Sequence, residues 1–125
     1  MVPKKKILIV DDEETLTFSL YQSFQLWNKH YEVVTAASGE EAIKKIMLSE
    51  FDLVITDISM PGMSGIELLS KIRTNYPKTE VIIMTAYGSE EKREEAIKNG
   101  AKYYLEKPFE IRELKDLVME LLSEP

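Results

Sequence analysis

The 125-residue sequence has no cysteine, one histidine and no apolar run near the roughly 18 residues that span a bilayer. The absence of cysteine excludes disulfides, thiolate metal sites and cysteine nucleophiles. A single histidine, His30, argues against a histidine-rich zinc site and against a Ser-His-Asp triad. Positive charge is also in deficit. The 16 Lys and Arg against 22 Asp and Glu give a net charge of −6, which argues against direct nucleic-acid binding.

What is present is typical of a globular chain, with 44% hydrophobic and 30% charged residues. The length predicts one domain covering residues 1–125. Three lysines precede the apolar run 7–10, but that run is too short for the hydrophobic region of a signal peptide. We therefore expect a cytoplasmic protein that does not associate with membranes.

Five short apolar runs alternate with longer stretches of helical period. The runs are 7–10, 33–36, 53–56, 81–84 and 103–105. Most of them lack polar alternation, which is typical of parallel strands that are covered on both faces.

The helical stretches carry apolar residues at spacings of three and four. The predicted stripes are Leu16, Leu20, Phe24 and Trp27; then Ile43, Ile46 and Met47 after a capping box at Ser38; Ile66, Leu69, Ile72 and Tyr76 after one at Ser64; and Ile111, Leu114, Val118 and Leu121. A further helix is expected from about Ser89 to Asn99. The pattern predicts an α/β fold: a single doubly wound (βα)5 sandwich with a five-stranded parallel sheet and flavodoxin-like topology.

The fourth helical stretch differs from the others because residues 89–95 are almost wholly polar or charged. Only Ala96 and Ile97 offer it an apolar contact. Two interpretations remain open: a solvated helix face, or a weakly anchored helix that moves at little cost.

Polar and ionisable residues follow four of the five predicted strands. They are Asp11 and Asp12 after the first run, Asp57 after the third, Thr85 and Ala86 after the fourth, and Lys107 after the fifth. Ligands of open α/β sheets bind at the carboxyl ends of the strands, so this edge is the expected site.

Three carboxylates at this edge need compensating positive charge. If Asp11, Asp12 and Asp57 lie about 5 Å apart at an effective dielectric of about 20, each pair repels by about 3 kcal/mol. Lys107 supplies one positive charge and a divalent ion would supply two more. Oxygen ligands favour Mg²⁺, with Mn²⁺ as the other candidate.

Each of these residues also has a simpler structural interpretation. Asp12 or Glu13 could cap the first helix, and Asp57 could be a turn residue. Thr85 could simply be the last residue of a strand, with no functional role, and Lys107 could be an ordinary surface lysine. All of these roles would have to coincide for the site to be absent.

The ordered set of motifs resembles the receiver domain of bacterial two-component response regulators, from Lys6 to about Leu122. The residues that carry the resemblance are Asp11-Asp12, Asp57 with Met60-Pro61-Gly62, Thr85-Ala86 and Lys107-Pro108. The resemblance implies two-component signal transduction: a phosphoprotein that receives its phosphoryl group from a histidine kinase and is not itself an enzyme.

The resemblance also implies a role for each residue. Asp57 is the phosphoacceptor, and Lys107, through a cis Lys107-Pro108 peptide, pairs with the phosphoryl oxygens. Asp12, Asp57 and the backbone carbonyl of Ser59 bind Mg²⁺ directly, and Asp11 binds it largely through water.

A conformational switch is implied by the same motifs. The Thr85 hydroxyl and the Ala86 N–H bind the phosphoryl group, and Tyr104 then moves inward. Tyr103 and Tyr104 point to opposite faces of their strand, so at most one of them is the switch residue, and the spacing to Lys107 favours Tyr104. Either ring could also simply pack in the core. A downstream protein or output domain responds, and the chain is a monomer or a weak phosphorylation-dependent dimer. The charged fourth helix argues against dimerisation through the face that many receivers use.

Two further expectations concern residues near the site. The bulky Tyr87 is expected to slow loss of phosphate relative to a Tyr87→Ala variant. Kinase specificity is expected on the exposed face of the first helix, at Thr17, Tyr21 and Gln25.

Three other functions remain as alternatives. A degenerate receiver could act as a docking module that is never phosphorylated. A Mg²⁺-dependent phosphohydrolase usually has a second acid two residues after its aspartyl nucleophile, where this chain has Ser59. A flavin-binding protein would need a first loop that cradles phosphate, and an acidic loop repels it.

Overall fold

The computed structural model describes residues 4–27 and 30–122. Its strands are β1 (Lys5–Val10), β2 (Tyr31–Ala36), β3 (Leu53–Asp57), β4 (Glu80–Thr85) and β5 (Tyr103–Glu106). All of the strand pairs are parallel, and the five strands form one sheet. Each predicted run lies within an observed strand, and all five strands extend beyond their runs by one or two residues in total.

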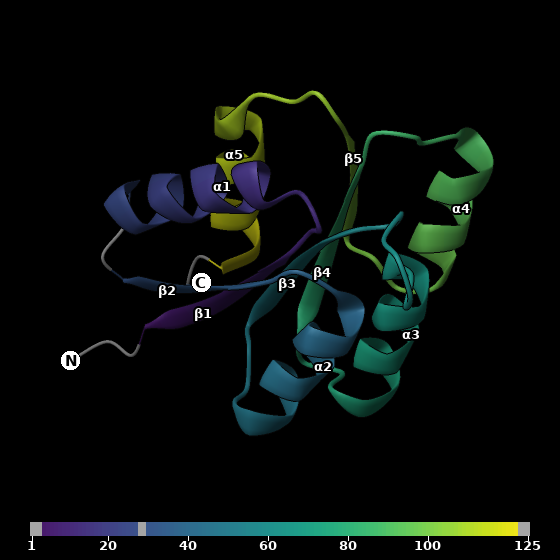
Figure 1. Ribbon diagram of the computed structural model, residues 1–125, viewed down its shortest axis with the longest axis horizontal. Coiled ribbons are helices and arrows are strands. Elements are labelled where there is room, and N and C mark those ends of the chain that lie inside the picture. Colours follow the sequence, from purple (N-terminus) through teal and green to yellow (C-terminus); the bar gives the residue numbers. More distant parts are fainter. Residues whose placement is uncertain (1–3, 28–29, 123–125) are drawn as a thin grey trace.

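Helices follow every strand. They are α1 (Glu14–Trp27), α2 (Gly39–Leu48), α3 (Gly65–Asn75), α4 (Glu90–Lys98) and α5 (Ile111–Leu122). Helices α1 and α5 cover one face of the sheet, and α2, α3 and α4 cover the other (Figure 1). The predicted doubly wound sandwich is confirmed. Within the described residues, no helix is long and apolar enough to cross a membrane.

The strand order β2-β1-β3-β4-β5 sets the position of the site. The chain moves outward from β1 to β2 and then returns to β3 on the other side of β1, so the order reverses between β1 and β3. Val10 pairs with Thr56 at the carboxyl ends of these two strands. This register brings the residues that follow them, Asp11 and Asp57, to the same edge.

The core consists of one apolar cluster on each face of the sheet. The interior of each central strand is fully buried, which explains the unbroken apolar runs in the sequence. Two residues assigned to helix core stripes are more exposed than predicted, Met47 at 70% and Ile111 at 36%, and Ile97, expected to provide one of the two apolar contacts of α4, is 43% exposed. Met47 and Ile97 lie within two residues of a helix end, and Ile111 is the first residue of α5. At these helix ends the side chains no longer pack against the sheet.

The helices differ in how firmly they are held. In α3, Ser64 and Glu67 form a complete capping box, and four residues of the helix are buried. In α4, the side chain of Ser89 caps the first turn, but Ala96 is the only buried residue. This burial agrees with both interpretations of the sequence, a solvated helix face and a weakly anchored helix.

Candidate functional site

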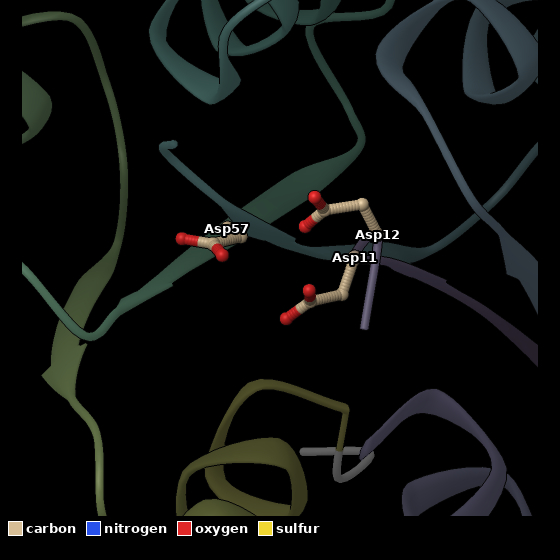
Figure 2. A group of neighbouring side chains, drawn as sticks. All are labelled: Asp11, Asp12 and Asp57. Atoms are coloured by element: carbon tan, nitrogen blue, oxygen red, sulfur yellow. The ribbon is translucent and has the colours of Figure 1, made fainter. Parts of the chain in front are cut away.

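Three carboxylates from two loops converge beyond the carboxyl ends of β1 and β3. Each of Asp11, Asp12 and Asp57 offers an oxygen, and these oxygens lie within 4.8 Å of one another (Figure 2). Asp11 is 1% exposed and Asp57 is 6% exposed, whereas Asp12 is open to solvent. The close approach predicted from the sequence is present.

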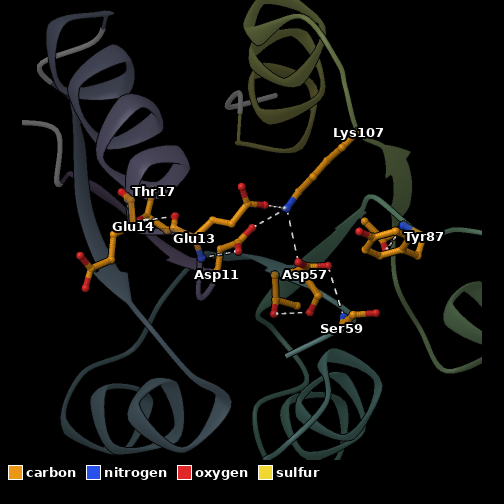
Figure 3. Close-up of polar contacts among 10 residues, drawn as sticks. Asp11, Glu13, Glu14, Thr17, Asp57, Ser59, Tyr87 and Lys107 are labelled. Atoms are coloured by element: carbon orange, nitrogen blue, oxygen red, sulfur yellow. Dashed lines mark hydrogen bonds and ion pairs between the residues drawn. The ribbon is translucent and has the colours of Figure 1, made fainter. Parts of the chain in front are cut away.

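Lys107, from the loop after β5, reaches across the same edge. Its Nζ lies 2.7 Å from Asp11 Oδ2, 3.3 Å from Asp57 Oδ2 and 3.2 Å from Glu13 Oε1 (Figure 3). The Lys107-Pro108 peptide is cis, as the resemblance implied. The lysine is therefore directed into the acidic cluster and not toward bulk solvent.

Burial and charge act in opposite directions on these groups. Burial raises the pKa of the Asp11 carboxyl, and the hydrogen bonds it accepts from Lys107 and Glu13 lower it, but the net shift is upward. Burial lowers the pKa of Lys107. The hydrogen bond to Asp11 and the negative charges of Asp11 and Asp57 raise it by more, so the net shift of the Lys107 pKa is upward. Lys107 is thus a permanent cation at neutral pH.

The donor set fits a hard divalent cation. All of the side-chain donors are carboxylate oxygens, and the exposed position of Asp12 leaves one side of the cluster open to water. Mg²⁺ characteristically keeps several waters and takes one or two carboxylates. One lysine against three carboxylates also leaves negative charge for an ion to neutralise.

Two close backbone approaches hold the loop after β3. The Gly65 N–H donates to the Ile58 carbonyl at 2.9 Å, and a Cβ at Gly65 would collide with the Asp57 carbonyl oxygen. Gly62 has a φ of +78°, a conformation that residues with a side chain rarely adopt. The Ser59 N–H donates to Asp57 Oδ1 at 3.3 Å. This loop therefore presents the Asp57 carboxylate with one oxygen bonded to backbone and the other near Lys107.

Thr85 and Ala86 lie at the end of β4 beside the acidic cluster. Thr85 is fully buried, and its hydroxyl oxygen accepts a hydrogen bond from the Tyr87 N–H at 3.3 Å. Ala86 is exposed, and the Tyr87 side chain is 76% exposed. The threonine hydroxyl is thus engaged by its own loop.

Tyr104 lies on the opposite side of β5 from Tyr103, as strand geometry requires. It is 8% exposed and packs in the cluster under α2, α3 and α4. Its hydroxyl is buried and has no hydrogen-bond partner in the described part of the chain. The resemblance implied that Tyr104 moves inward on phosphorylation, with simple packing in the core as the alternative. In this structure the ring already lies inward, and its hydroxyl is close to the position that a Cβ at Gly88 would occupy.

Glu13 is a site residue that the sequence interpretation treated only as a possible helix cap. Its N–H donates to Asp11 Oδ1 at 2.9 Å, and its carboxylate contacts Lys107. Its position directly after two aspartates was the available signal, because the residue shares their loop.

The surface of α1 differs from its prediction at one position. Thr17 is 8% exposed because its hydroxyl donates to the Glu14 carbonyl at 3.0 Å and the residue faces the sheet. Tyr21 is partly buried and Gln25 is exposed. Thr17 therefore cannot present a recognition side chain.

The fold and the site are those of a known family. The family model described as the response regulator receiver domain matches residues 7–119. The chain belongs to this family. It is a receiver domain of the two-component type and takes part in phosphoacceptor signal transduction. Receiver domains bind Mg²⁺ at an acidic site, take phosphate from histidine kinases and regulate output domains.

Curated relatives include proteins of very different length. The chain is 44% identical over 113 residues to the response regulator protein FleR of Pseudomonas aeruginosa, covering 90% of this chain and 24% of FleR. It is 37% identical over 118 residues to sporulation initiation phosphotransferase F of Bacillus subtilis, covering 94% of each. The chain thus spans about a quarter of the length of the first relative and nearly all of the second.

Solved structures agree in fold. A CheY-like receiver domain of Methanospirillum hungatei JF-1 has a TM-score of 0.88 at 36% identity, covering 94% of this chain and 92% of that one. The response regulator protein TrrA of Thermotoga maritima, in complex with Mg²⁺ and beryllofluoride, has a TM-score of 0.83 at 40% identity, covering 94% and 99%.

Proposed function

We propose that Asp57 is the phosphoacceptor of this receiver domain and that a histidine kinase is its phosphodonor. The observation that carries the proposal is the position of Asp57, which lies 3.3 Å from the Lys107 ammonium and within the three-carboxylate cluster. Asp11 is equally buried and lies closer to Lys107, but both of its oxygens are engaged, Oδ1 by the Glu13 N–H at 2.9 Å and Oδ2 by Lys107 at 2.7 Å. The contacts of Asp57 are longer, 3.3 Å to the Ser59 N–H and 3.3 Å to Lys107, which favours Asp57 as the carboxylate free to react.

The reaction needs positioning and charge neutralisation more than covalent assistance. A carboxylate oxygen of Asp57 forms a bond to phosphorus while the nitrogen–phosphorus bond of the donor phosphohistidine breaks. The electron pair of that bond stays with the imidazole nitrogen. Lys107 neutralises charge on the phosphoryl oxygens as they approach.

Three groups would hold Mg²⁺ directly: the carboxylates of Asp12 and Asp57 and the backbone carbonyl of Ser59. Asp11 would act largely through water. The ion would supply positive charge to the phosphoryl oxygens. Mn²⁺ has the same preference for oxygen ligands and would substitute.

The phosphoryl group would then redirect the loop after β4. It carries close to two negative charges and strong acceptor oxygens, which the Thr85 hydroxyl and the Ala86 N–H would bind. Thr85 would first have to give up the hydrogen bond from Tyr87. Because Tyr104 already lies inward, phosphorylation would fix that ring in place and would not have to draw it in.

The signal would pass by protein contact, to a downstream protein or an output domain. The chain would act as a monomer or a weak phosphorylation-dependent dimer. The charged surface of α4 disfavours the face made by α4, β5 and α5 as a strong interface. The domain would not turn over external substrates, and its reactions would be its own phosphorylation and dephosphorylation.

The phosphohydrolase alternative has less support from the site. The residue two positions after Asp57 is Ser59, and its hydroxyl does not ionise near neutral pH, so it cannot serve as the general acid that a carboxylic acid would be. A docking module that is never phosphorylated would have no need for Lys107 to be directed at Asp57. Incubation with phosphomonoesters and Mg²⁺ would detect turnover if the first alternative held.

The test is phosphorylation by acetyl phosphate with Mg²⁺, followed by intact-mass measurement. The wild type is expected to gain one labile phosphoryl group, and Asp57→Asn none. An Asp12→Asn variant should be phosphorylated slowly, because it keeps the acceptor and loses a metal ligand. A gain of equal size in Asp57→Asn would refute the assignment.

A further inference from the structure

Glu13 is the unassigned member of the group that surrounds Lys107. Three carboxylates contact the lysine Nζ, and two of them, from Asp11 and Asp57, belong to the metal cluster. The third, from Glu13, lies 3.2 Å from Nζ. It does not belong to that cluster, so an ion bound there would leave it free to hold the lysine.

The backbone fixes the position of Glu13. Its N–H donates to Asp11 Oδ1 at 2.9 Å, and its carbonyl accepts the first hydrogen bond of α1, from the Thr17 N–H at 3.1 Å. Both backbone polar groups of Glu13 are therefore hydrogen-bonded, which fixes the point from which its side chain extends. Figure 3 shows its carboxylate turned toward the lysine, whereas the carboxylate of the next residue, Glu14, points away.

The contact between Glu13 and Lys107 is on the solvent side of the site. The Glu13 side chain is 64% exposed, whereas the Asp11 side chain is fully buried. An exposed ion pair is weak and is broken by a stronger competitor. A phosphoryl group, with nearly two charges, is such a competitor for the same ammonium group.

We propose that Glu13 is a positioning residue: it holds the Lys107 ammonium in the unphosphorylated protein and has to release it when the phosphoryl group arrives. Its negative charge also repels an incoming phosphodonor. Both effects slow phosphorylation, so Glu13 sets how readily Asp57 is modified. The inference rests on the proposed function of Asp57 and Lys107.

The experiment compares Glu13→Gln with Glu14→Gln in the full chain. Both variants lose one carboxylate from the same turn, but among the described residues no hydrogen bond or ion pair joins Glu14 to Lys107 through its side chain. Glu14→Gln is therefore the matched control for net charge. The measured quantity is the second-order rate constant of phosphorylation by acetyl phosphate with Mg²⁺.

We expect Glu13→Gln to raise this rate constant about three- to fivefold, the size that follows from loss of one exposed ion pair. Glu14→Gln should raise the rate constant by less than about twofold, because the charge that it removes makes no contact with Lys107 and is screened by solvent. High salt should reduce both effects, because exposed ion pairs and the repulsion of an incoming donor are screened. Part of the effect of Glu13→Gln should remain, because the 3.2 Å contact with Lys107 is much shorter than the Debye length.

A second measurement separates positioning from a structural role. Beryllofluoride with Mg²⁺ mimics the bound phosphoryl group without a reaction, and calorimetry gives its dissociation constant. Glu13→Gln should bind beryllofluoride more tightly than the wild type and Glu14→Gln should not. If Glu13 only supported the start of α1, its substitution would lower the free energy of unfolding and leave this constant unchanged.

The outcomes distinguish the two proposals. If the wild type is phosphorylated and the two variants match each other in both measurements, the role of Glu13 is refuted and the function of Asp57 stands. If the wild type gains no phosphoryl group, the proposed function fails, and the role of Glu13 fails with it.

Discussion

At the scale of single residues, the site depends on small changes of position that only three-dimensional packing determines. The sequence identified Asp11, Asp12, Asp57 and Lys107 because acidic and basic residues directly follow apolar runs. It did not identify the position of Tyr104, since a tyrosine on a strand can lie inside or outside the core. The structure places the ring inside the core, with its hydroxyl next to Gly88.

The contact between Gly88 and Tyr104 can be tested by substitution. A Cβ at residue 88 would overlap the Tyr104 hydroxyl, so Gly88→Ala should force the ring from the core. Replacing a loop glycine by alanine otherwise stabilises a protein by about 0.4–1 kcal/mol. We expect instead a loss of about 1–2 kcal/mol in the free energy of unfolding by urea.

The control is the same substitution in a Tyr104→Phe background. Phenylalanine lacks the hydroxyl that an added Cβ would meet, so the loss should be smaller there. If Gly88→Ala stabilises the wild type, the overlap does not restrain the ring.

At the scale of helices and strands, the sequence predicted the type of every element and was less accurate about which side chains are buried. The strands followed from their apolar runs, because a strand covered on both faces needs no polar alternation. Met47 and Ile97 were misplaced because periodicity continues to the end of a helix while contact with the sheet does not. Thr17 was misplaced because its hydroxyl bonds to the backbone of its own helix, which lets a polar residue face the core.

Helix α4 should open more readily than its neighbour α3. Only Ala96 is buried in α4, whereas α3 buries four residues and has a complete capping box. Local opening free energy follows the buried apolar contacts of a segment. In hydrogen–deuterium exchange at neutral pH, the amides of α4 should exchange at least about tenfold faster than those of α3. Equal protection of the two helices would contradict the weak anchoring of α4.

At the scale of the whole molecule, the strand order places the reactive groups. The residues at the site lie at the carboxyl ends of β1, β3, β4 and β5 or directly after them, and the reversal between β1 and β3 brings the aspartates together. That convergence follows from a general rule for parallel sheets, which is why the site could be predicted before the structure. The contact between Glu13 and Lys107 follows from no such rule, because it depends on how far two flexible side chains reach.

Magnesium should stabilise the folded protein as a whole. The folded chain gathers three carboxylates that the unfolded chain separates, so the ion binds the native state and raises its melting temperature. At a hundredfold excess over the dissociation constant the gain is about 2.7 kcal/mol. Thermal unfolding with increasing MgCl₂ measures it, with Asp12→Asn and Asp57→Asn as variants that should respond less. Equal responses to NaCl at matched ionic strength would show that screening, not binding, is responsible.

The unequal charges at the edge of the sheet have a consequence for the living cell. Lys107 faces the three carboxylates of the cluster and that of Glu13, so the resting site has an excess of negative charge that one Mg²⁺ would largely offset. Under the proposed function, the rate at which an upstream kinase phosphorylates this domain would depend on the concentration of free Mg²⁺. A fall in the Mg²⁺ concentration would lower the extent of phosphorylation even if the kinase and the downstream partner were unchanged. The Mg²⁺ concentration would therefore affect signalling in addition to the stimulus.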